Sequence, residues 1–172
     1  MKEKIFCPYC GTRFIKKLEK RKRRLYCSNC EQFFYDNPIP GVVAIVPDKK
    51  NDKIVLIKRK VIPRAGFWAL PGGFIDKNEN AQKAIFRELS EETGLKPDSL
   101  ELMDTLYRNS KVYGPIVVIC FVVNSYNGVI KAGDDALEVD FFSLDNLPSL
   151  AFHSHKKFID IYKSKRISQN RF

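Results

Sequence analysis

The most informative stretch of this sequence covers residues 73–95 and reads GFIDKNENAQKAIFRELSEETGL. Residues 79–92 within it predict an α-helix, because apolar side chains recur there at helical spacing. These side chains are Ala81, Ala84, Ile85 and Leu89. Gly94 is expected to end the helix, since glycine readily adopts the left-handed conformation of a C-cap. The apolar stripe must face a core, so packing sets the rotation of the helix about its axis.

Three glutamates crowd one flank of this predicted helix. Glu88 and Glu92 are one turn apart on the helix, and Glu88 and Glu91 are nearly one turn apart. Negative charges gathered near a helix C-terminus repel one another and interact unfavourably with the helix dipole. A divalent cation would relieve this repulsion, and carboxylate oxygens are ligands that magnesium and manganese prefer. Considered alone, the glutamates fit a solvated acidic helix end equally well.

The spacing across the whole stretch resembles the Nudix box, G-x5-E-x7-R-E-U-x-E-E-x-G-U, in which U is an aliphatic residue. All constrained positions match: Gly73, Glu79, Arg87, Glu88, Leu89, Glu91, Glu92, Gly94 and Leu95. VLIKR at residues 55–59 and GFWALPGG at residues 66–73 also resemble the approach to the box in this family. FFSLDNLP at residues 141–148 resembles the usual ending of the domain, so the resemblance covers about residues 38–150.

The resemblance implies an α/β fold, namely a Nudix-type α/β/α sandwich with a mixed sheet. It also implies a hydrolase that uses Mg²⁺ or Mn²⁺ to cleave a diphosphate linkage. Glu88, Glu91 and Glu92 would coordinate the metal. Gly73 would let the backbone approach this metal site closely, because glycine carries no side chain.

Further catalytic roles follow from the same resemblance. Arg87 would pair with a carboxylate of the box and orient it, since a guanidinium fork matches carboxylate geometry. Glu79 would steady the loop–helix–loop unit rather than take part in the chemistry. The base in this family is often a glutamate outside the helix, or one of the box glutamates. The acids in the corresponding segment are Asp134, Asp135 and Glu138, of which Asp135 is the candidate base although it is shorter than the usual glutamate.

Four of the five cysteines form two C-x2-C pairs near the N-terminus, Cys7 with Cys10 and Cys27 with Cys30. This spacing is typical of a structural Zn²⁺ site with four thiolate ligands. Two disulfides are the alternative, but they need an oxidising compartment, which nothing in the sequence indicates. The fifth cysteine, Cys120, lies in an apolar run and is expected in the core.

The cysteine spacing divides the chain into two expected domains. Residues 1–36 would form a zinc ribbon, and residues 37–172 would form the Nudix domain with a C-terminal helix. The prolines and glycine of residues 36–41 mark the boundary between them. A segment as short as the ribbon buries little core, so zinc would hold it folded. The charged insert KKLEKRKRR, residues 16–24, is expected to be the exposed turn between the ribbon's strands.

The other apolar segments predict strands and a final helix. Strands are expected at residues 42–46, 53–59, 100–107, 116–123 and 137–142, and a helix at residues 155–165. This order predicts an α/β domain with a mixed sheet. The two histidines, His153 and His155, show no metal-binding spacing and are expected at the surface.

The net charge of +10 is concentrated at the two ends of the chain. Residues 1–40 carry ten Lys/Arg against four Asp/Glu, and residues 156–172 carry six against one. Such ends can attract RNA, but solvated charge that aids solubility is the favoured explanation. No apolar run is long enough to span a bilayer, and no secretory signal is visible. A cytoplasmic protein without membrane contact is therefore expected.

The box indicates the reaction but not the substrate. The subgroup that joins a zinc ribbon to a Nudix domain favours a small-molecule nucleotide substrate such as FAD or ADP-ribose, and a homodimer is common in the family. Residues 107–115, YRNSKVYGP, replace the motif SQPWPFPxS of the family's NADH pyrophosphatases, which disfavours NAD(H). The candidate substrate contacts are the aromatic residues Tyr35, Phe74 and Tyr113, with Phe67 and Trp68 as further rings that could stack on adenine.

Three alternatives to this function stay open. Two are enzymes of the same reaction class that would act on NAD(H) or on the 5′ end of capped RNA. The third is a regulator that senses a nucleotide without cleaving it. Regulators of this fold usually lose box glutamates, whereas this sequence keeps all of them, so an enzyme is favoured.

Overall fold

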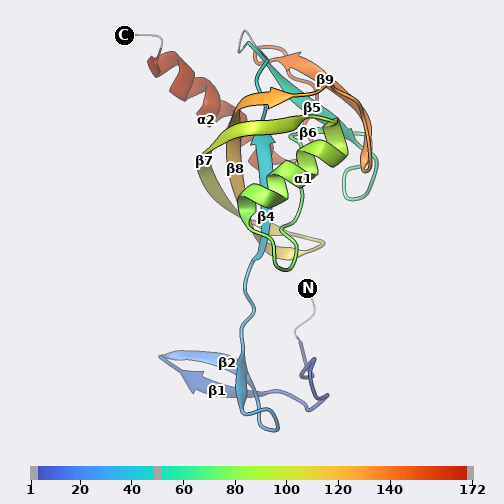
Figure 1. Cartoon of the computed structure of the whole chain (residues 1–172). Helices are drawn as coiled ribbons and strands as arrows, with labels where there is room; N and C mark the ends of the chain where they lie inside the picture. The colour runs from blue at the N-terminus through green and yellow to red at the C-terminus, as the bar shows by residue number, and fades with distance from the viewer. Residues whose placement is uncertain (1–3, 49–51, 170–172) are drawn as a thin grey trace.

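The computed structural model describes residues 4–48 and 52–169. Figure 1 shows a small N-terminal sheet that an extended segment joins to a larger body of sheets and helices. Neither helix in the described residues is long and apolar enough to cross a membrane.

The N-terminal sheet is antiparallel, with the strand order β1-β2-β3. Its strands are β1 (Ile15–Glu19), β2 (Lys22–Cys27) and β3 (Gln32–Phe34). Lys20 and Arg21 connect β1 to β2 with positive φ angles of 40° and 70°, which suits a tight hairpin turn. The prediction of an exposed turn over residues 16–24 is therefore wrong except at these two residues. The charge of the insert indicated exposure, but in so small a sheet the strand side chains are exposed as well.

The larger body contains two further sheets. One has the order β4-β8-β7 and consists of β4 (Ile39–Ile45), β8 (Gly114–Asn127) and β7 (Lys96–Ser110). The other has the order β6-β5-β9 and consists of β6 (Trp68–Ala69), β5 (Lys53–Arg59) and β9 (Ala136–Ser143). β4 runs parallel to β8, whereas the other pairs are antiparallel. The expected mixed sheet is confirmed.

Strand β4 lies between two helices, α1 (Ala81–Thr93) and α2 (His153–Gln169). Successive side chains of a strand point to opposite faces. Val43 and Ile45 accordingly join the core cluster that contains residues of α2. Val42 and Ala44 join the cluster that contains the buried face of α1. This alternation builds the α/β/α layers that the resemblance implied.

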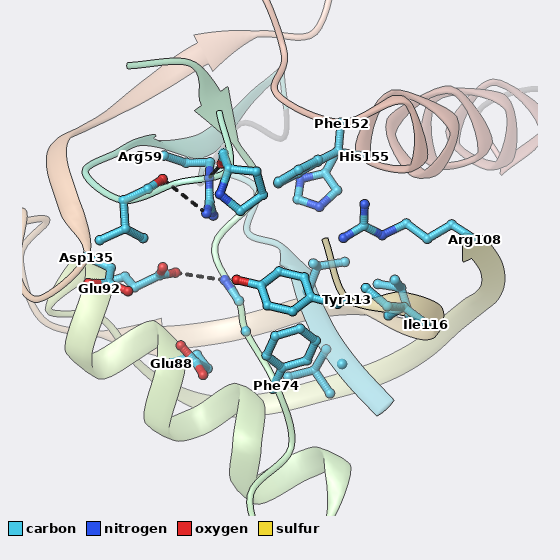
Figure 2. A pocket seen from close by; sticks show the side chains of 18 of the residues that line it. Arg59, Phe74, Glu88, Glu92, Arg108, Tyr113, Ile116, Asp135, Phe152 and His155 are labelled. Carbon is cyan, nitrogen blue, oxygen red and sulfur yellow. Dashed lines mark hydrogen bonds between the residues drawn. The ribbon is translucent and has the colours of Figure 1, made fainter. Parts of the chain in front are cut away.

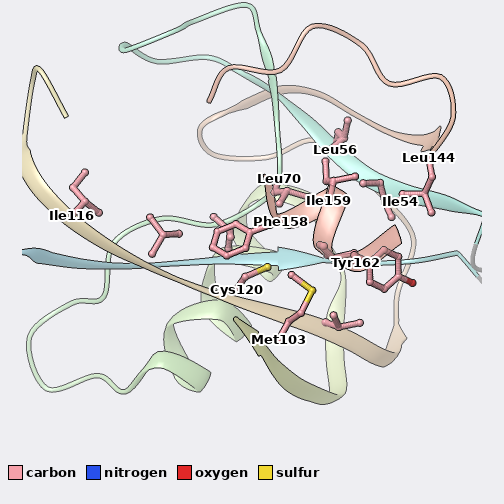
Figure 3. Close-up of a cluster of buried hydrophobic side chains, with 14 residues drawn as sticks. Ile54, Leu56, Leu70, Met103, Ile116, Cys120, Leu144, Phe158, Ile159 and Tyr162 are labelled. Carbon is pink, nitrogen blue, oxygen red and sulfur yellow. The ribbon is translucent and has the colours of Figure 1, made fainter. Parts of the chain in front are cut away.

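The core on the α2 side contains the largest fully buried side chain of the described residues, Phe158. Phe158 and Ile159 are completely buried, and Tyr162 packs in the same cluster (Figure 3). Cys120 is also completely buried there, which confirms the expected core thiol. The predicted helix over residues 155–165 lies within α2. The face of α2 that carries Phe158, Ile159 and Tyr162 packs into this core.

Helix α1 begins slightly later than predicted. Asn80 is its N-cap, because its side chain accepts a hydrogen bond from the Lys83 amide at 2.9 Å. Glu79 lies before the cap, so the prediction that the helix starts there is wrong. Gly94 ends the helix with a φ of 71°, as expected. The buried residues of α1 include Ala84, Ile85 and Leu89, so the predicted stripe faces the core.

The hairpin of β7 and β8 is longer than the sequence indicated. Strands were expected at residues 100–107 and 116–123, but pairing continues from Lys96 with Asn127 to Ser110 with Gly114. The outer residues of β7 are mostly exposed. Cross-strand backbone hydrogen bonds rather than burial hold these ends, and hydrophobic periodicity does not detect such bonds.

Truncating the buried ring of Phe158 should destabilise the larger body. We expect Phe158→Ala to lower the free energy of unfolding by about 3–5 kcal/mol, because the change removes buried apolar surface and leaves a cavity. Urea unfolding followed by circular dichroism measures this loss. Ile167→Ala is the matched control, since Ile167 lies on the same helix and is exposed. A loss at Phe158 no larger than the loss at Ile167 would contradict this account of the core.

Candidate active site

The segment between β6 and α1 is built into the sheet beside β4. The Val42 amide donates to the carbonyl of Gly73 at 2.8 Å, and the Ala44 amide donates to the carbonyl of Pro71 at 2.9 Å. These hydrogen bonds form along the edge of β4 opposite the edge that pairs with β8. The segment is therefore fixed next to the strand that lies between the two helices.

Two glycines in this segment allow close approaches, Gly72 to β4 and Gly73 to α1. Gly72 has a φ of 141°, and a Cβ on it would lie 2.7 Å from the Cα of Val43. A Cβ on Gly73 would lie 2.7 Å from the carboxylate carbon of Glu88. A Cβ on Gly72 would collide with the backbone of β4, whereas a Cβ on Gly73 would displace the Glu88 carboxylate. The backbone of the segment therefore lies directly against the acidic flank of α1.

Glu92 is buried at the centre of this junction, with 4% of its surface exposed. Its carboxylate accepts a hydrogen bond from the Gly72 amide at 2.8 Å (Figure 2). Burial raises the pKa of Glu92 to about 8, and the negative charges of Glu88 and Asp135 act in the same direction. The Gly72 hydrogen bond and the charge of Arg59 oppose this shift. An acid held here carries its charge only with help from positive groups.

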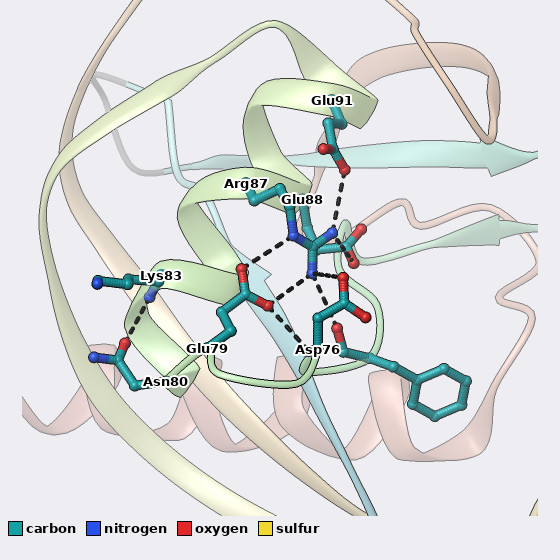
Figure 4. A network of polar contacts seen from close by, with 8 residues as sticks. Asp76, Glu79, Asn80, Lys83, Arg87, Glu88 and Glu91 are labelled. Atoms are coloured by element: carbon teal, nitrogen blue, oxygen red, sulfur yellow. Dashed lines mark hydrogen bonds and ion pairs between the residues drawn. The ribbon is translucent and has the colours of Figure 1, made fainter.

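Arg87 gathers the other carboxylates around a single guanidinium (Figure 4). It donates two hydrogen bonds to Glu79, both of 3.0 Å. It also donates to Glu88 at 2.8 Å and to Glu91 at 3.2 Å, and to the carbonyl of Phe74 at 3.1 Å. The Glu79 pair lowers the pKa of that glutamate. Arg87 therefore ties the loop before α1 to the glutamates on α1.

Negative charge still exceeds positive charge in this region. Burial raises the pKa of Glu88 above its usual range, although hydrogen bonding to Arg87 opposes the rise. The three glutamate carboxylates do not meet at one point. In the described part of the chain, only the four cysteines place three or more potential ligand atoms all within 4.8 Å of one another. The oxygen donors and the excess negative charge suit a hard divalent cation.

A pocket of about 330 Å³ lies in front of the acidic flank. Figure 2 shows Glu88, Glu92 and Asp135 on one side of it and Arg108 on the other. Glu91 is not among the lining residues. The pocket thus brings carboxylates and cationic side chains to a single cavity, and β4, β5, β7 and α1 all contribute to its wall.

Two of the three candidate aromatic contacts lie in this pocket. The rings of Phe74 and Tyr113 are 5.2 Å apart and meet edge to face. Tyr35 lies instead near the N-terminal sheet, where its hydroxyl donates to Glu19 at 2.7 Å and Arg24 stacks on its ring. Tyr35 does not line this pocket, because the residues that precede it in sequence belong to the small sheet.

The three candidate acids after β8 have different surroundings. Asp135 lines the pocket close to Glu92. Asp134 is exposed, and its carbonyl accepts a hydrogen bond from Lys60 at 3.4 Å. Glu138 forms an ion pair of 2.8 Å with Lys58 on the neighbouring strand. Only Asp135 of these three is placed at the pocket.

His155 was expected at the surface, and this prediction is wrong. It is 7% exposed, lines the pocket, and accepts a hydrogen bond on Nδ1 from the Leu70 amide at 3.0 Å. Burial lowers its pKa to about 3, with further lowering by the charges of Arg108 and Arg59. Helical spacing could have revealed it, since His155 shares a face of α2 with the buried Phe158 and Ile159.

The four cysteines of the C-x2-C pairs converge in the N-terminal segment. The Sγ atoms of Cys10 and Cys27 are 3.4 Å apart, and those of Cys7 and Cys30 are 3.9 Å apart. All four Sγ atoms lie within 4.8 Å of one another. Hydrogen bonds with Thr12 lower the pKa of Cys10 to about 5, which favours the thiolate form that binds metals. Four sulfurs arranged in this way could hold one zinc ion.

Comparison with known proteins agrees with this geometry. The sequence pattern of the NUDIX domain matches residues 38–161. A protein of Methanocaldococcus jannaschii named ADP-ribose pyrophosphatase is 40% identical over 159 residues, which cover 92% of this chain and 87% of the relative. The NAD-capped RNA hydrolase NudC of Pseudomonas aeruginosa is 26% identical over 94% of this chain, but the match covers only 56% of NudC.

Solved structures share the fold. A MutT NUDIX hydrolase from Burkholderia pseudomallei is 26% identical and covers 73% of this chain and 98% of its own, with a TM-score of 0.67. The NUDIX domain of Shewanella oneidensis NrtR, solved in complex with ADP-ribose, is 24% identical over 81% of this chain and 93% of its own, with a TM-score of 0.68. Together with the family pattern and the archaeal relative, these matches show that the chain belongs to the Nudix family and is a Nudix hydrolase.

Proposed function

We propose that this chain hydrolyses the diphosphate linkage of ADP-ribose in the presence of Mg²⁺. The observation that carries the proposal is the junction of Gly72 and Gly73 with the acidic flank of α1, which borders a pocket large enough for part of a nucleotide. The name of the archaeal relative supports ADP-ribose over FAD. The absence of the SQPWPFPxS motif still argues against NAD(H).

Glu88, Glu91 and Glu92 are the residues we assign to holding the metal, with the backbone at Gly73 beside them. Their hard oxygens and uncompensated charge fit Mg²⁺, or Mn²⁺ in its place. Bound there, the cation would neutralise charge on the diphosphate and make a water molecule a better nucleophile. Arg87 would orient Glu88 and Glu91 through its hydrogen bonds to them.

Asp135 is our candidate for the group that accepts a proton from the attacking water. Its place at the pocket beside Glu92 supports this role. The ring pair of Phe74 and Tyr113 offers a surface on which an adenine can stack. Arg59 and Arg108 provide positive charge toward the diphosphate.

We assign the N-terminal segment, residues 1–36, to a structural zinc ribbon and residues 37–172 to the catalytic domain. The convergence of four sulfurs supports one zinc ion with no open position for substrate. A catalytic zinc would need such an open position, so the ribbon's role is to brace the fold. Cytoplasmic location and a homodimer remain expectations of this proposal.

The first test concerns the metal-binding glutamates. We expect Glu91→Gln or Glu92→Gln to lower turnover of ADP-ribose by roughly a hundredfold or more, about 3 kcal/mol of barrier. The reason is that an amide oxygen is a weaker ligand for Mg²⁺ than a carboxylate. Turnover is measured at saturating Mg²⁺, with circular dichroism to confirm folding. Glu101→Gln is the matched control, because Glu101 is exposed on β7 away from the pocket. Near-normal turnover of a folded Glu92→Gln protein would refute the assignment.

The second test concerns the zinc ribbon. Protein purified without added metal should contain about one equivalent of zinc per chain. Cys27→Ser should lose most of this zinc, because one of four thiolate ligands is removed. Cys120→Ser should keep it, since Cys120 lies in the core of the larger body. Metal analysis by mass spectrometry decides the matter, and zinc content unaffected by Cys27→Ser would count against the ribbon.

The third test uses the raised pKa of Glu92. The folded chain holds the proton on the Glu92 carboxyl more tightly than the unfolded chain does, because glutamate in an unfolded chain has a pKa of about 4.3. Glu92 therefore stabilises the metal-free fold most at low pH, and this contribution is lost as the pH rises through about 8. We expect the Tm of the metal-free protein to fall between about pH 5 and about pH 8 relative to Glu92→Gln, and Mg²⁺ to reduce the fall. Identical pH profiles for the two proteins would contradict the burial argument.

A further inference from the structure

Two arginines at the edge of the pocket lie against the same aromatic ring. The guanidinium of Arg59 lies 5.1 Å from the ring centre of Phe152, and that of Arg108 lies 4.8 Å from it (Figure 2). Neither forms an ion pair with any residue that the structure describes. Burial lowers the pKa of Arg108, and the charge of Arg59 lowers it further. Two like charges on one ring are costly unless an anion neutralises them.

A second groove, of about 520 Å³, adjoins the pocket at this point. The two cavities share Pro63, Arg108 and Phe152 in their walls. The loop after β5, the end of the β7–β8 hairpin and the start of α2 enclose the groove. Its cationic residues are Arg64, Arg108, Lys111 and Lys157, and no aspartate or glutamate lines it.

The groove differs from its neighbour on the other side of α2's N-terminus. In that neighbouring groove Lys156 pairs with Asp160 at 3.0 Å, and Lys163 pairs with Asp145 at 2.9 Å. In the groove beside the pocket, Lys111 and Lys157 form no ion pair with a described residue. The positive charge there is not neutralised within the described chain.

Two polar atoms at the groove also have no hydrogen-bond partner within the described chain. They are Nε of Arg108 and the hydroxyl oxygen of Ser154, and both residues line the groove. Both atoms are buried, so the side chains would have to turn toward the groove before these atoms could bind a ligand there. A phosphate group accepts hydrogen bonds and carries negative charge that would neutralise the lysines and arginines of the groove.

We propose that this groove is a second anion-binding subsite, which takes a phosphate group that the substrate carries outside its scissile diphosphate. The inference rests on the proposed function, since it assumes that the diphosphate lies at the acidic flank of α1. Arg108 would lie between the two subsites, because it lines both cavities. Lys111 and Lys157 would contact only the phosphate that lies in the second groove, because neither lysine lines the first pocket. The extra phosphate can be a monoester on the nucleotide or the first phosphodiester of a 5′-linked oligonucleotide.

Calorimetry without magnesium tests the subsite independently of catalysis. The probes are AMP, adenosine 2′,5′-bisphosphate and adenosine 3′,5′-bisphosphate. At least one bisphosphate should bind about tenfold more tightly than AMP, since a charge-assisted hydrogen bond contributes on that scale. In a Lys111→Met/Lys157→Met variant this advantage should fall below about threefold, while the Kd of AMP changes less than about twofold. Lys96→Met is the control for charge alone, because Lys96 is exposed at the far end of β7 and lines neither cavity.

Turnover measured with magnesium distinguishes the subsite from the proposed function. It also distinguishes a phosphate monoester on the nucleotide from the phosphodiester of an oligonucleotide. Lys111→Met/Lys157→Met should hydrolyse ADP-ribose normally but show a KM raised about tenfold for 2′-phospho-ADP-ribose or for a diphosphate-capped oligonucleotide. The substrate that responds identifies the source. Failure of the unaltered chain to hydrolyse ADP-ribose would refute the proposed function, while the bisphosphate binding would still report on the groove. The subsite is overturned if neither bisphosphate binds more tightly than AMP, or if the advantage survives in the double variant.

Discussion

The catalytic half of this molecule depends on the burial of one carboxylate. Glu92 is almost fully enclosed where α1 meets the Gly72–Gly73 segment, and its carboxylate accepts a hydrogen bond from the Gly72 amide. Burial of a carboxylate opposes its ionisation. The position is tolerated because glycine lets the backbone amide reach the acid and because β4 holds that backbone in place. The buried acid and the proposed metal site therefore lie at one junction.

Arg87 controls the remaining charge around this junction. It bonds Glu79, Glu88 and Glu91 together, and so links the loop that precedes α1 to the last turns of the helix. One guanidinium cannot neutralise all these carboxylates, which leaves the acidic flank ready for a divalent cation. Across the pocket, Arg59 and Arg108 provide an excess of positive charge. The proposed substrate, a nucleotide diphosphate with its metal, would complement both sides, because it would bring negative charge to the arginines and positive charge to the glutamates.

The N-terminal segment follows a different rule. Its three short strands bury few side chains, and the apolar residues Ile15 and Leu18 are exposed. Such a sheet cannot be stabilised by a core of its own. In the proposed zinc ribbon, a metal held by the four cysteine sulfurs, which lie within 4.8 Å of one another, would take the place of that core.

The spacing of residues along the sequence alone determined the helix α1, its acidic flank and the cysteine pairs, because helical period and metal-ligand spacing are local properties of the chain. Only the tertiary structure decided which distant residues share the pocket. Tyr35 was excluded from it because the small sheet lies apart, whereas His155 entered it because α2 packs its buried face near Leu70. Arg108 became part of two cavities through the pairing of β7 with β8 and the approach of Phe152. These neighbours are set by the docking of sheets and helices, which depends on long-range packing rather than on any spacing that the sequence displays.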